Sequence, residues 1–328
     1  MKSEIVGPKM LMQAILSNRL AIFFGAGIGV EFGFKSWEAL VEELYNRIEI
    51  DDTQTSDEIT NAIKYRDFLT ALDILKTSNQ SDFESILSSE NSNFNGEDIS
   101  NSNEKLLFDL GAEIYLTTNI DSSLEYVKAH IGKASLPIWN YKTDAVEIRD
   151  ALITRGVEEN PLVIRLHGDL NNKESLIFTS TDYAQLRLKN NYVFETLLPA
   201  ILTTYTILFV GYSLDDPDIK MLLENVSKVQ GRNLNLIALF DDGDKEVITV
   251  HKENYFKANF GVDIIRMNKL GNENKTEQLK RYLTDLLFIK RKMDPVQNDE
   301  FVVKEAVQSF REDKSTKVYI QKLRGNKE

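Results

Sequence analysis

Short apolar runs alternate along this chain with longer stretches in which apolar residues recur at helical spacing. The apolar runs lie at residues 20–24, 114–116, 162–164, 207–210, 234–240 and 262–267. Strands that are buried on both faces are apolar throughout, whereas half-exposed strands alternate between polar and apolar positions. The runs therefore predict buried strands of a parallel sheet.

Amphipathic stretches around these runs predict the helices that cover the sheet. They lie at residues 8–19, 36–45, 59–75, 83–87, 122–130, 216–230, 246–260 and 276–292. Ser36 stands at the start of the second stretch, where a hydroxyl can cap the first turn of a helix. This alternation is typical of an α/β fold, with a doubly wound parallel sheet and helices on both faces.

Two regions depart from the alternation. Residues 88–103 are rich in Ser, Asn, Glu and Asp, which predicts a mobile loop within a helical insertion at about 51–105. The charged C-terminal tail predicts a helix over 299–311. Its apolar residues form a stripe that needs a partner, consisting of Phe301, Val302, Ala306, Val307 and Phe310.

Four of the predicted strands end in turns that carry glycine or polar residues. The turns are Gly25-Ala26-Gly27-Ile28-Gly29, Thr117-Thr118-Asn119-Ile120-Asp121, Arg165-Leu166-His167-Gly168-Asp169 and Gly211-Tyr212-Ser213-Leu214. The carboxyl ends of parallel strands lie at one edge of a sheet, and ligands of such folds bind there. We therefore expect the four turns to surround one nucleotide.

The first and last of these turns have the features of a phosphate site. The residues Gly25-Ala26-Gly27 let the backbone approach a pyrophosphate, whose oxygens the N–H groups can bind without a basic side chain. A tight strand-to-helix turn would also explain both glycines. Ser213 is the candidate hydroxyl in the last turn, and residues 215–218 chiefly predict a helix start.

The two middle turns carry the candidate catalytic side chains. The amide of Asn119 can hold a water or a ribose without adding charge near a developing cation. Asp121 either accepts from ribose hydroxyls or caps the following helix. A neutral imidazole accepts a proton near pH 7, and His167 stands before Gly168, which leaves its ring unshielded at the sheet edge.

Together the four turns resemble the sirtuin-like domain of bacterial NAD-consuming anti-phage defence proteins, of the Thoeris-like and HerA-associated types. In that family a GAGxS turn, a T-x-N-x-D turn, a strand-borne H-G and a G-[YTF]-S turn surround NAD. The resemblance covers about residues 12–290. It implies a Rossmann-like sheet of the sirtuin large-domain type, with Asn119 and His167 as catalytic residues. It further implies NAD contacts from Gly25, Ala26, Gly27, Thr118, Asp121, Gly211 and Ser213.

The chain departs from the family pattern near the glycine turn. Residue 29 is Gly where the family usually has Ser, so one expected polar contact is missing. Lys35-Ser36-Trp37 stands where the family often has Pro-Ser-Trp, and we interpret Trp37 as a core anchor. The family region that corresponds to residues 88–103 lies over the NAD cleft, so this loop is either a lid or a tolerated surface insertion.

Composition narrows the chemistry. The 328 residues include no cysteine, which excludes disulfides and the four-Cys zinc site of the deacetylating sirtuins. The three histidines show no zinc-binding spacing, and we expect no zinc. A net charge of −12 disfavours electrostatic binding of nucleic acid. The amino terminus shows neither a membrane span nor a signal pattern, so we expect a cytoplasmic protein without a membrane contact.

Two reactions and one binding role fit the same pocket. A hydrolase needs only water to cleave the nicotinamide–ribose bond, and the missing zinc cysteines favour it over an NAD-dependent protein deacylase. The expected activity is therefore that of an NAD+ hydrolase, which forms nicotinamide and ADP-ribose. A non-catalytic NAD or ADP-ribose sensor would tolerate loss of Asn119 or His167, and both are present.

The resemblance also implies that the activity is regulated, because an unregulated NAD+ hydrolase would kill its host. We expect a homo-oligomer, and a partner such as a HerA-type ATPase or another defence-system component. NAD depletion would then act in antiviral defence by abortive infection. We expect residues 1–292 to form the NAD-binding and catalytic domain, and residues 293–328 to form a tail for assembly or partner docking.

Overall fold

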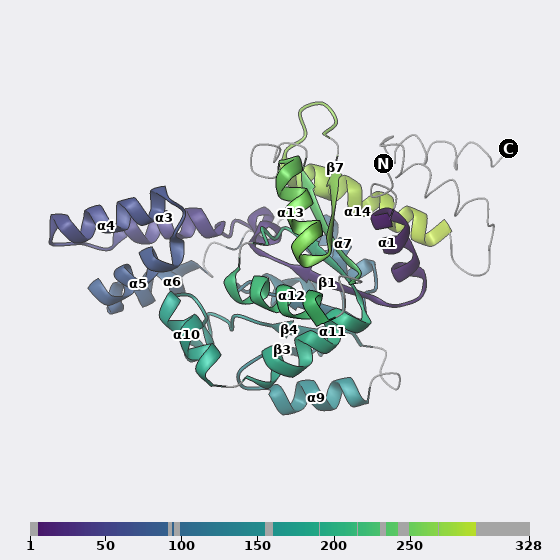
Figure 1. The fold of residues 1–328 in the computed structure, drawn as a ribbon, viewed down its shortest axis with the longest axis horizontal. Helices are drawn as coiled ribbons and strands as arrows, with labels where there is room; N and C mark the ends of the chain where they lie inside the picture. The colour runs from purple at the N-terminus through teal and green to yellow at the C-terminus, as the bar shows by residue number, and fades with distance from the viewer. Residues whose placement is uncertain are drawn as a thin grey trace.

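The computed structural model describes residues 6–90, 94, 99–154, 160–189, 191–214, 216–229, 234–241, 249–267 and 269–292. Its centre is a seven-stranded sheet with the order β3-β4-β2-β1-β5-β6-β7, in which all neighbouring strands are parallel (Figure 1). The strands are β1 (Leu20–Phe24), β2 (Ile114–Thr117), β3 (Ile138–Asn140), β4 (Leu162–Arg165), β5 (Thr206–Val210), β6 (Leu236–Asp241) and β7 (Val262–Met267). The predicted doubly wound parallel sheet is confirmed.

The apolar runs became strands where we expected them, with one addition. The edge strand β3 has only three residues, too few to stand out as an apolar run. In the sheet, Phe24 lies opposite both Thr117 and Val210, and Thr117 lies opposite Arg165. The ends of β4, β2, β1 and β5 are therefore level, and the four turns leave the sheet at the same edge.

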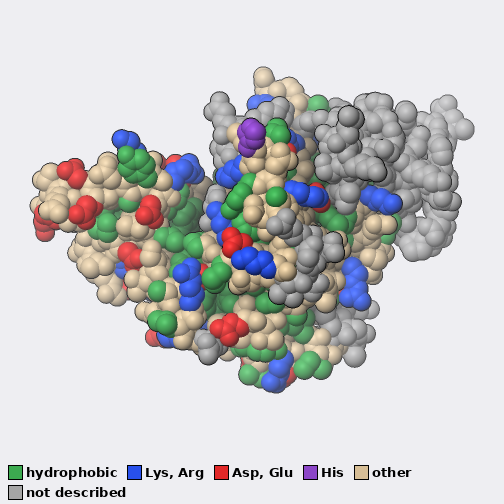
Figure 2. Space-filling model, in the orientation of Figure 1, with side chains coloured by type: hydrophobic (Ala, Val, Ile, Leu, Met, Phe, Trp, Pro, Cys, Tyr) green, Lys and Arg blue, Asp and Glu red, His purple; other side chains and the backbone are tan. Residues whose placement is uncertain are grey.

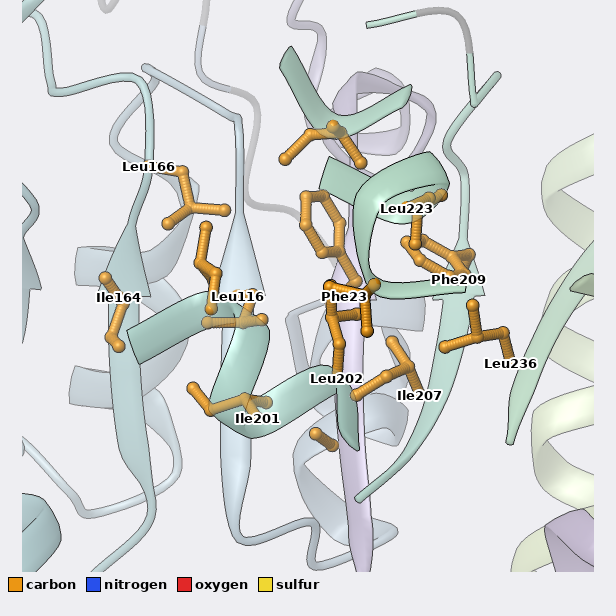
Figure 3. Close-up of a cluster of buried hydrophobic side chains, with 14 of the residues drawn as sticks. Phe23, Leu116, Ile164, Leu166, Ile201, Leu202, Ile207, Phe209, Leu223 and Leu236 are labelled. Atoms are coloured by element: carbon orange, nitrogen blue, oxygen red, sulfur yellow. The ribbon is translucent and has the colours of Figure 1, made fainter. Parts of the chain in front are cut away.

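Helices cover both faces of the sheet. One face packs against α1 (Val6–Leu16), α7 (Asn103–Asp109), α8 (Ser123–His130) and α14 (Lys275–Lys292). The other packs against α9 (Ala145–Ile153), α10 (Ser180–Leu188), α11 (Leu198–Thr204), α12 (Pro217–Val229) and α13 (Val250–Phe260). Successive strand residues face opposite cores, so Phe23 and Phe209 contact the second set of helices, as Figure 3 shows beside Ile201 and Leu223. Short helical turns are α2 (Ala26–Gly29), η2 (Val30–Phe32), η4 (Ile99–Asn101), η5 (Lys173–Ser175) and η6 (Val193–Leu197).

A group of four helices between β1 and β2 has a hydrophobic cluster of its own. They are α3 (Trp37–Arg47), α4 (Thr53–Lys64), α5 (Phe68–Ser78) and α6 (Gln80–Ser89), and they lie to one side of the sheet (left in Figure 1). We call this group the helical lobe. Acidic side chains stand at its outer end in Figure 2. Trp37 packs edge-on against Phe178, with ring centroids 4.6 Å apart, so the interpretation of Trp37 as a core anchor is confirmed.

The prediction of one continuous helical stretch over residues 59–75 was wrong. Two helices stand there, because the chain turns between Lys64 and Phe68, where Arg66 adopts a left-handed φ of 60°. Asp67 then caps α5 through a bond from the Thr70 N–H. The Ser36 cap is confirmed, since its side chain accepts from the Ala39 N–H.

The predicted loop over residues 88–103 is described only in part. Helix α6 extends to Ser89, and α7 begins at Asn103 with Ser102 as its cap. Between them Phe94 stacks on Tyr126, with ring centroids 3.7 Å apart. The tail helix predicted over 299–311 lies outside the described residues. Of the helices that are described, none is long and apolar enough to cross a membrane.

Candidate functional site

The glycine turn after β1 and the turn after β5 interlock. The Gly25 N–H donates to the Val210 carbonyl at 3.1 Å, and the Gly27 N–H donates to the Gly211 carbonyl at 3.0 Å. A Cβ atom at Gly27 would lie 2.9 Å from that same carbonyl oxygen, and one at Gly25 would lie 2.6 Å from the Tyr212 ring. The two glycines are therefore needed for this close packing. Two of the N–H groups expected to face a pyrophosphate serve the contact between the turns, so their role in phosphate binding stays a prediction.

The turn after β5 leaves one side chain exposed. Gly211 has a φ of 60°, and Tyr212 folds back on Phe23 with ring centroids 4.8 Å apart. Ser213 is exposed, and Leu214 returns to the core. Ser213 is thus the residue of this turn whose side chain can meet a ligand.

Asn119 is buried with an unsatisfied side chain. It is 4% exposed, its N–H donates to the Thr117 hydroxyl, and its carbonyl accepts from Arg165 Nη1 at 3.0 Å. Neither the oxygen nor the nitrogen of its amide has a hydrogen-bond partner among the described residues. A buried polar group left without a partner costs about 1–3 kcal/mol. Such an amide, next to the half-buried Thr118, indicates that a polar ligand completes the site.

Asp121 has the capping role, which is one of its two expected roles. Its Oδ1 accepts from the Ser123 N–H at 2.9 Å, which is the capping bond expected at the start of α8. Its Oδ2 lies on the other side, where a Cβ atom at Gly29 would be 3.1 Å away. A serine at position 29 would crowd this oxygen. The departure from the family pattern at Gly29 therefore leaves room around the Asp121 carboxylate.

His167 is buried at the end of β4 and faces an acid. Its ring is edge-on to Tyr183, with centroids 5.6 Å apart, and its Nε2 lies 3.2 Å from Asp216 Oδ2. Gly168 follows with a φ of 78°, and a Cβ atom there would lie 2.4 Å from the Ser175 carbonyl oxygen. Only glycine fits this sharp turn, which directs the His167 side chain across the sheet edge.

Asp216 and Tyr183 were missed as site residues. The sequence chiefly predicts a helix start at residues 215–218, and Asp216 Oδ1 does cap α12 by accepting from the N–H groups of Asp218 and Ile219. Its Oδ2 accepts from the Tyr183 hydroxyl at 2.5 Å and faces His167. Burial raises the pKa of Asp216, but the charge of His167 and the hydrogen bonds outweigh it and lower the pKa overall. An ionised carboxylate therefore orients the imidazole. The sequence signal that could have identified Asp216 is its position just after the turn that follows β5.

The register of the sheet places the two candidate catalytic residues on neighbouring strands. Thr117 pairs with Arg165, and Asn119 and His167 each stand two residues further on. Arg165 joins the two turns, because its guanidinium binds the Asn119 carbonyl and Glu125 Oε2 at 2.6 Å. Among the described residues no group of three or more acidic or histidine side chains could hold a metal ion.

Comparison with known proteins agrees with this geometry. A family model described as a SIR2-like domain matches residues 113–265, which carry three of the four turns. The NAD(+) hydrolase ThsA of Cytobacillus dafuensis is 25% identical over 275 residues, 84% of this chain and 50% of the relative. The ThsA of Enterococcus faecium is 27% identical over 225 residues, 69% of this chain and 43% of the relative. Defense-associated sirtuin 2 of Bacillus subtilis is 30% identical over 147 residues, 43% of this chain and 14% of the relative.

The chain thus spans half or less of the length of these curated relatives. The matched region begins one residue before β2 and ends within β7, so it contains five whole strands and most of β7. The order of the strands, the turns at the strand ends and the family match all agree with the expected sirtuin-like sheet. Residues 113–265 of this chain match the model of a SIR2-like domain.

Proposed function

We propose that this protein is an NAD+ hydrolase that cleaves the nicotinamide–ribose bond with water and releases nicotinamide and ADP-ribose. The observation that carries the proposal is the buried, unsatisfied amide of Asn119 beside a histidine oriented by a carboxylate. The names of the ThsA relatives, which are NAD(+) hydrolases, support it.

Asn119, His167 and Asp216 would have different roles in this reaction. The Asn119 amide holds the nucleophilic water or the ribose, and it adds no charge beside the cationic transition state. His167 accepts the proton of that water, and the Asp216 carboxylate stabilises the imidazolium that results.

The remaining turns are proposed to bind the rest of NAD. Thr118 and Asp121 lie next to Asn119 and would hold hydroxyls of the nicotinamide ribose. The backbone around Gly25, Ala26 and Gly27 would meet the pyrophosphate. Gly211 and the exposed Ser213 would meet the phosphates and the adenosine ribose.

We propose further that the hydrolase depletes NAD in bacterial anti-phage defence. The names of the ThsA relatives and of the defence-associated sirtuin support this role. We infer a cytoplasmic effector that is gated by homo-oligomerisation or by a partner such as a HerA-type ATPase. In this scheme residues 1–292 form the catalytic domain and residues 293–328 form the docking tail.

The reaction is tested by product analysis. Purified protein, alone and with the products of neighbouring genes, is incubated with NAD or with NAD and an acetyl-lysine peptide, and products are separated by chromatography. We expect nicotinamide and ADP-ribose in both incubations and an unchanged peptide. Deacetylation at a comparable rate would contradict the hydrolase, and so would stoichiometric zinc in elemental analysis.

A further inference from the structure

A buried asparagine ends the edge strand β3, and the reaction described above does not use it. Asn140 is 5% exposed, and its Nδ2 lies 3.2 Å from Asp169 Oδ2 and 2.8 Å from Ser175 Oγ. Its Oδ1 accepts from the Lys142 N–H at 3.0 Å. The orientation of the amide follows from these partners, because a backbone N–H donates and a carboxylate accepts. Asn140 thus uses both ends of its amide in one buried network.

Asp169 and Ser175 belong to the loop that follows His167. The Asp169 Oδ1 accepts from two N–H groups further along this loop, at 2.9 and 3.0 Å, so its Oδ2 remains for Asn140. The Ser175 hydroxyl donates to the Asn172 carbonyl at 2.7 Å and accepts from the Asp169 N–H at 3.3 Å. The loop is therefore closed on itself, and Asn140 ties it to a neighbouring strand at two points.

This closed loop determines where the backbone of His167 lies. Gly168 packs directly on Ser175, because a Cβ atom at Gly168 would lie 2.4 Å from the Ser175 carbonyl oxygen. The His167 carbonyl accepts from the Ile177 N–H at 3.1 Å. The imidazole has to meet Asp216, which belongs to a different loop and lies 3.2 Å from His167 Nε2. The distance between these two groups therefore depends on how firmly the His167 loop is held.

We propose that Asn140 is a positioning residue, which ties the His167 loop to β3 through Asp169 and Ser175 and so holds the imidazole against Asp216. The inference rests on the proposed NAD+ hydrolase. A displacement of about 1 Å in a catalytic group can lower a rate by roughly a hundredfold. Because the imidazole acts in the reaction step, loss of Asn140 should lower kcat more than it raises KM.

The first test is a double-mutant cycle on kcat for NAD hydrolysis. Asn140→Ala should lower kcat roughly tenfold or more, with a smaller change in KM. In a His167→Ala background the same change should lower kcat by less than about threefold, because the imidazole that Asn140 positions is gone. An equal loss in both backgrounds would mean that Asn140 supports the fold in general, and it would overturn the proposal.

An exchange of donor and acceptor keeps the proposal testable if Asn140→Ala does not fold. In Asn140→Asp a second carboxylate faces Asp169, so kcat should fall. Combining it with Asp169→Asn restores one donor and one acceptor, and the amide oxygen at position 169 can still accept the N–H groups of the loop. The double variant should recover kcat at least about fivefold over Asn140→Asp, the scale of one hydrogen bond. No recovery would contradict the bridge between these two side chains.

The last test needs no catalysis and therefore separates this proposal from the proposed function. The chain has three histidines, His130, His167 and His251, so a protein labelled with ¹⁵N-histidine gives three sets of ring signals. His167→Ala identifies those of His167. At one fixed pH and without NAD, Asn140→Ala should shift the His167 ring signals and leave the other two sets in place.

Asn191→Ala is the matched control. The Asn191 amide oxygen also holds a turn, since it accepts from the N–H groups of Val193 and Phe194. The helical turns after it lead to the amino end of β5, whereas His167 lies at the carboxyl edge of the sheet. Unchanged His167 signals in Asn140→Ala, or an equal shift in Asn191→Ala, would overturn the proposal even in an inactive protein. The expected shift in a protein that releases no nicotinamide would refute the hydrolase alone.

Discussion

At the scale of single residues, the site joins an amide without a hydrogen-bond partner to a histidine whose Nε2 lies 3.2 Å from a carboxylate oxygen. Asn119 has a buried side chain with no hydrogen bond from the described residues, while His167 faces Asp216. The first arrangement leaves a place for the ligand. In the proposed reaction the second fixes a ring for proton transfer, as a carboxylate behind an imidazole does in other enzymes.

The Asp216 carboxylate should therefore matter for turnover more than for NAD binding. We expect Asp216→Asn to lower kcat roughly a hundredfold or more, because the amide cannot stabilise the imidazolium. Tyr183→Phe should cost about three- to tenfold, since Asp216 keeps both backbone N–H bonds. Steady-state kinetics with NAD provide the measurement. Asp263→Asn on the edge strand β7 serves as control, and equal kcat values for Asp216→Asn and Asp263→Asn would contradict the role.

Gly168 has a left-handed conformation in a place without room for a side chain. Gly168 and Gly132 have similar left-handed φ values of 78° and 73°, but a Cβ atom would clash with Ser175 only at Gly168. We expect Gly132→Ala to lower the free energy of unfolding by about 1–2 kcal/mol, the cost of the left-handed conformation alone. Gly168→Ala should lose about 2 kcal/mol more. Urea unfolding of both variants measures this, and equal losses would show that the loop relaxes around the added methyl group.

At the scale of elements, the turns after β4 and β5 converge although β2 and β1 lie between those strands. Each turn could be predicted, because an apolar run and the polar residues after it are local features of the sequence. The pairing of His167 with Asp216 could not be predicted. It depends on how far two loops reach across the sheet edge, and on Tyr183, which comes from α10.

In the helical lobe, too, local features could be predicted from the sequence, whereas long-range contacts could not. Its cap residue Ser36 is a local signal, but its attachment to the sheet depends on Leu170 and Phe178, which lie in the segment after His167. The break between α4 and α5 was missed because residues around Arg66 carry no glycine or proline. Packing of the two helices against each other sets that turn.

Phe178 should therefore be the main anchor of the lobe. We expect Phe178→Ala to lower the free energy of unfolding by about 3–5 kcal/mol, because the ring is buried between Trp37 and Phe83. Tyr65→Ala removes a ring that is 75% exposed, and it should change stability by less than about 0.5 kcal/mol. Chemical denaturation followed by the fluorescence of the two tryptophans, Trp37 and Trp139, reports on both variants. A loss below 1 kcal/mol for Phe178→Ala would mean that other contacts attach the lobe.

At the scale of the whole molecule, α14 completes the second core and ends at Lys292. A chain that ends at Asp294 should therefore stay folded and bind NAD. It should also lose self-association or partner binding if the tail stripe docks, because each large apolar side chain contributes about 1.5–3 kcal/mol when buried. Light scattering compares the two lengths. Unchanged mass and unchanged partner binding would contradict docking, and failure to fold would indicate that the tail packs on its own domain.

The central claim is that Asn119 and His167, brought together at one sheet edge, cleave NAD. The most direct measurement is the rate of nicotinamide release by the wild type, Asn119→Ala, His167→Ala and the control His251→Ala, which alters an exposed histidine on α13. We expect the first two variants to lose roughly a hundredfold or more while keeping the fold intact. His251→Ala should match the wild type. Near wild-type turnover at saturating NAD in either site variant would contradict the assignment of that residue.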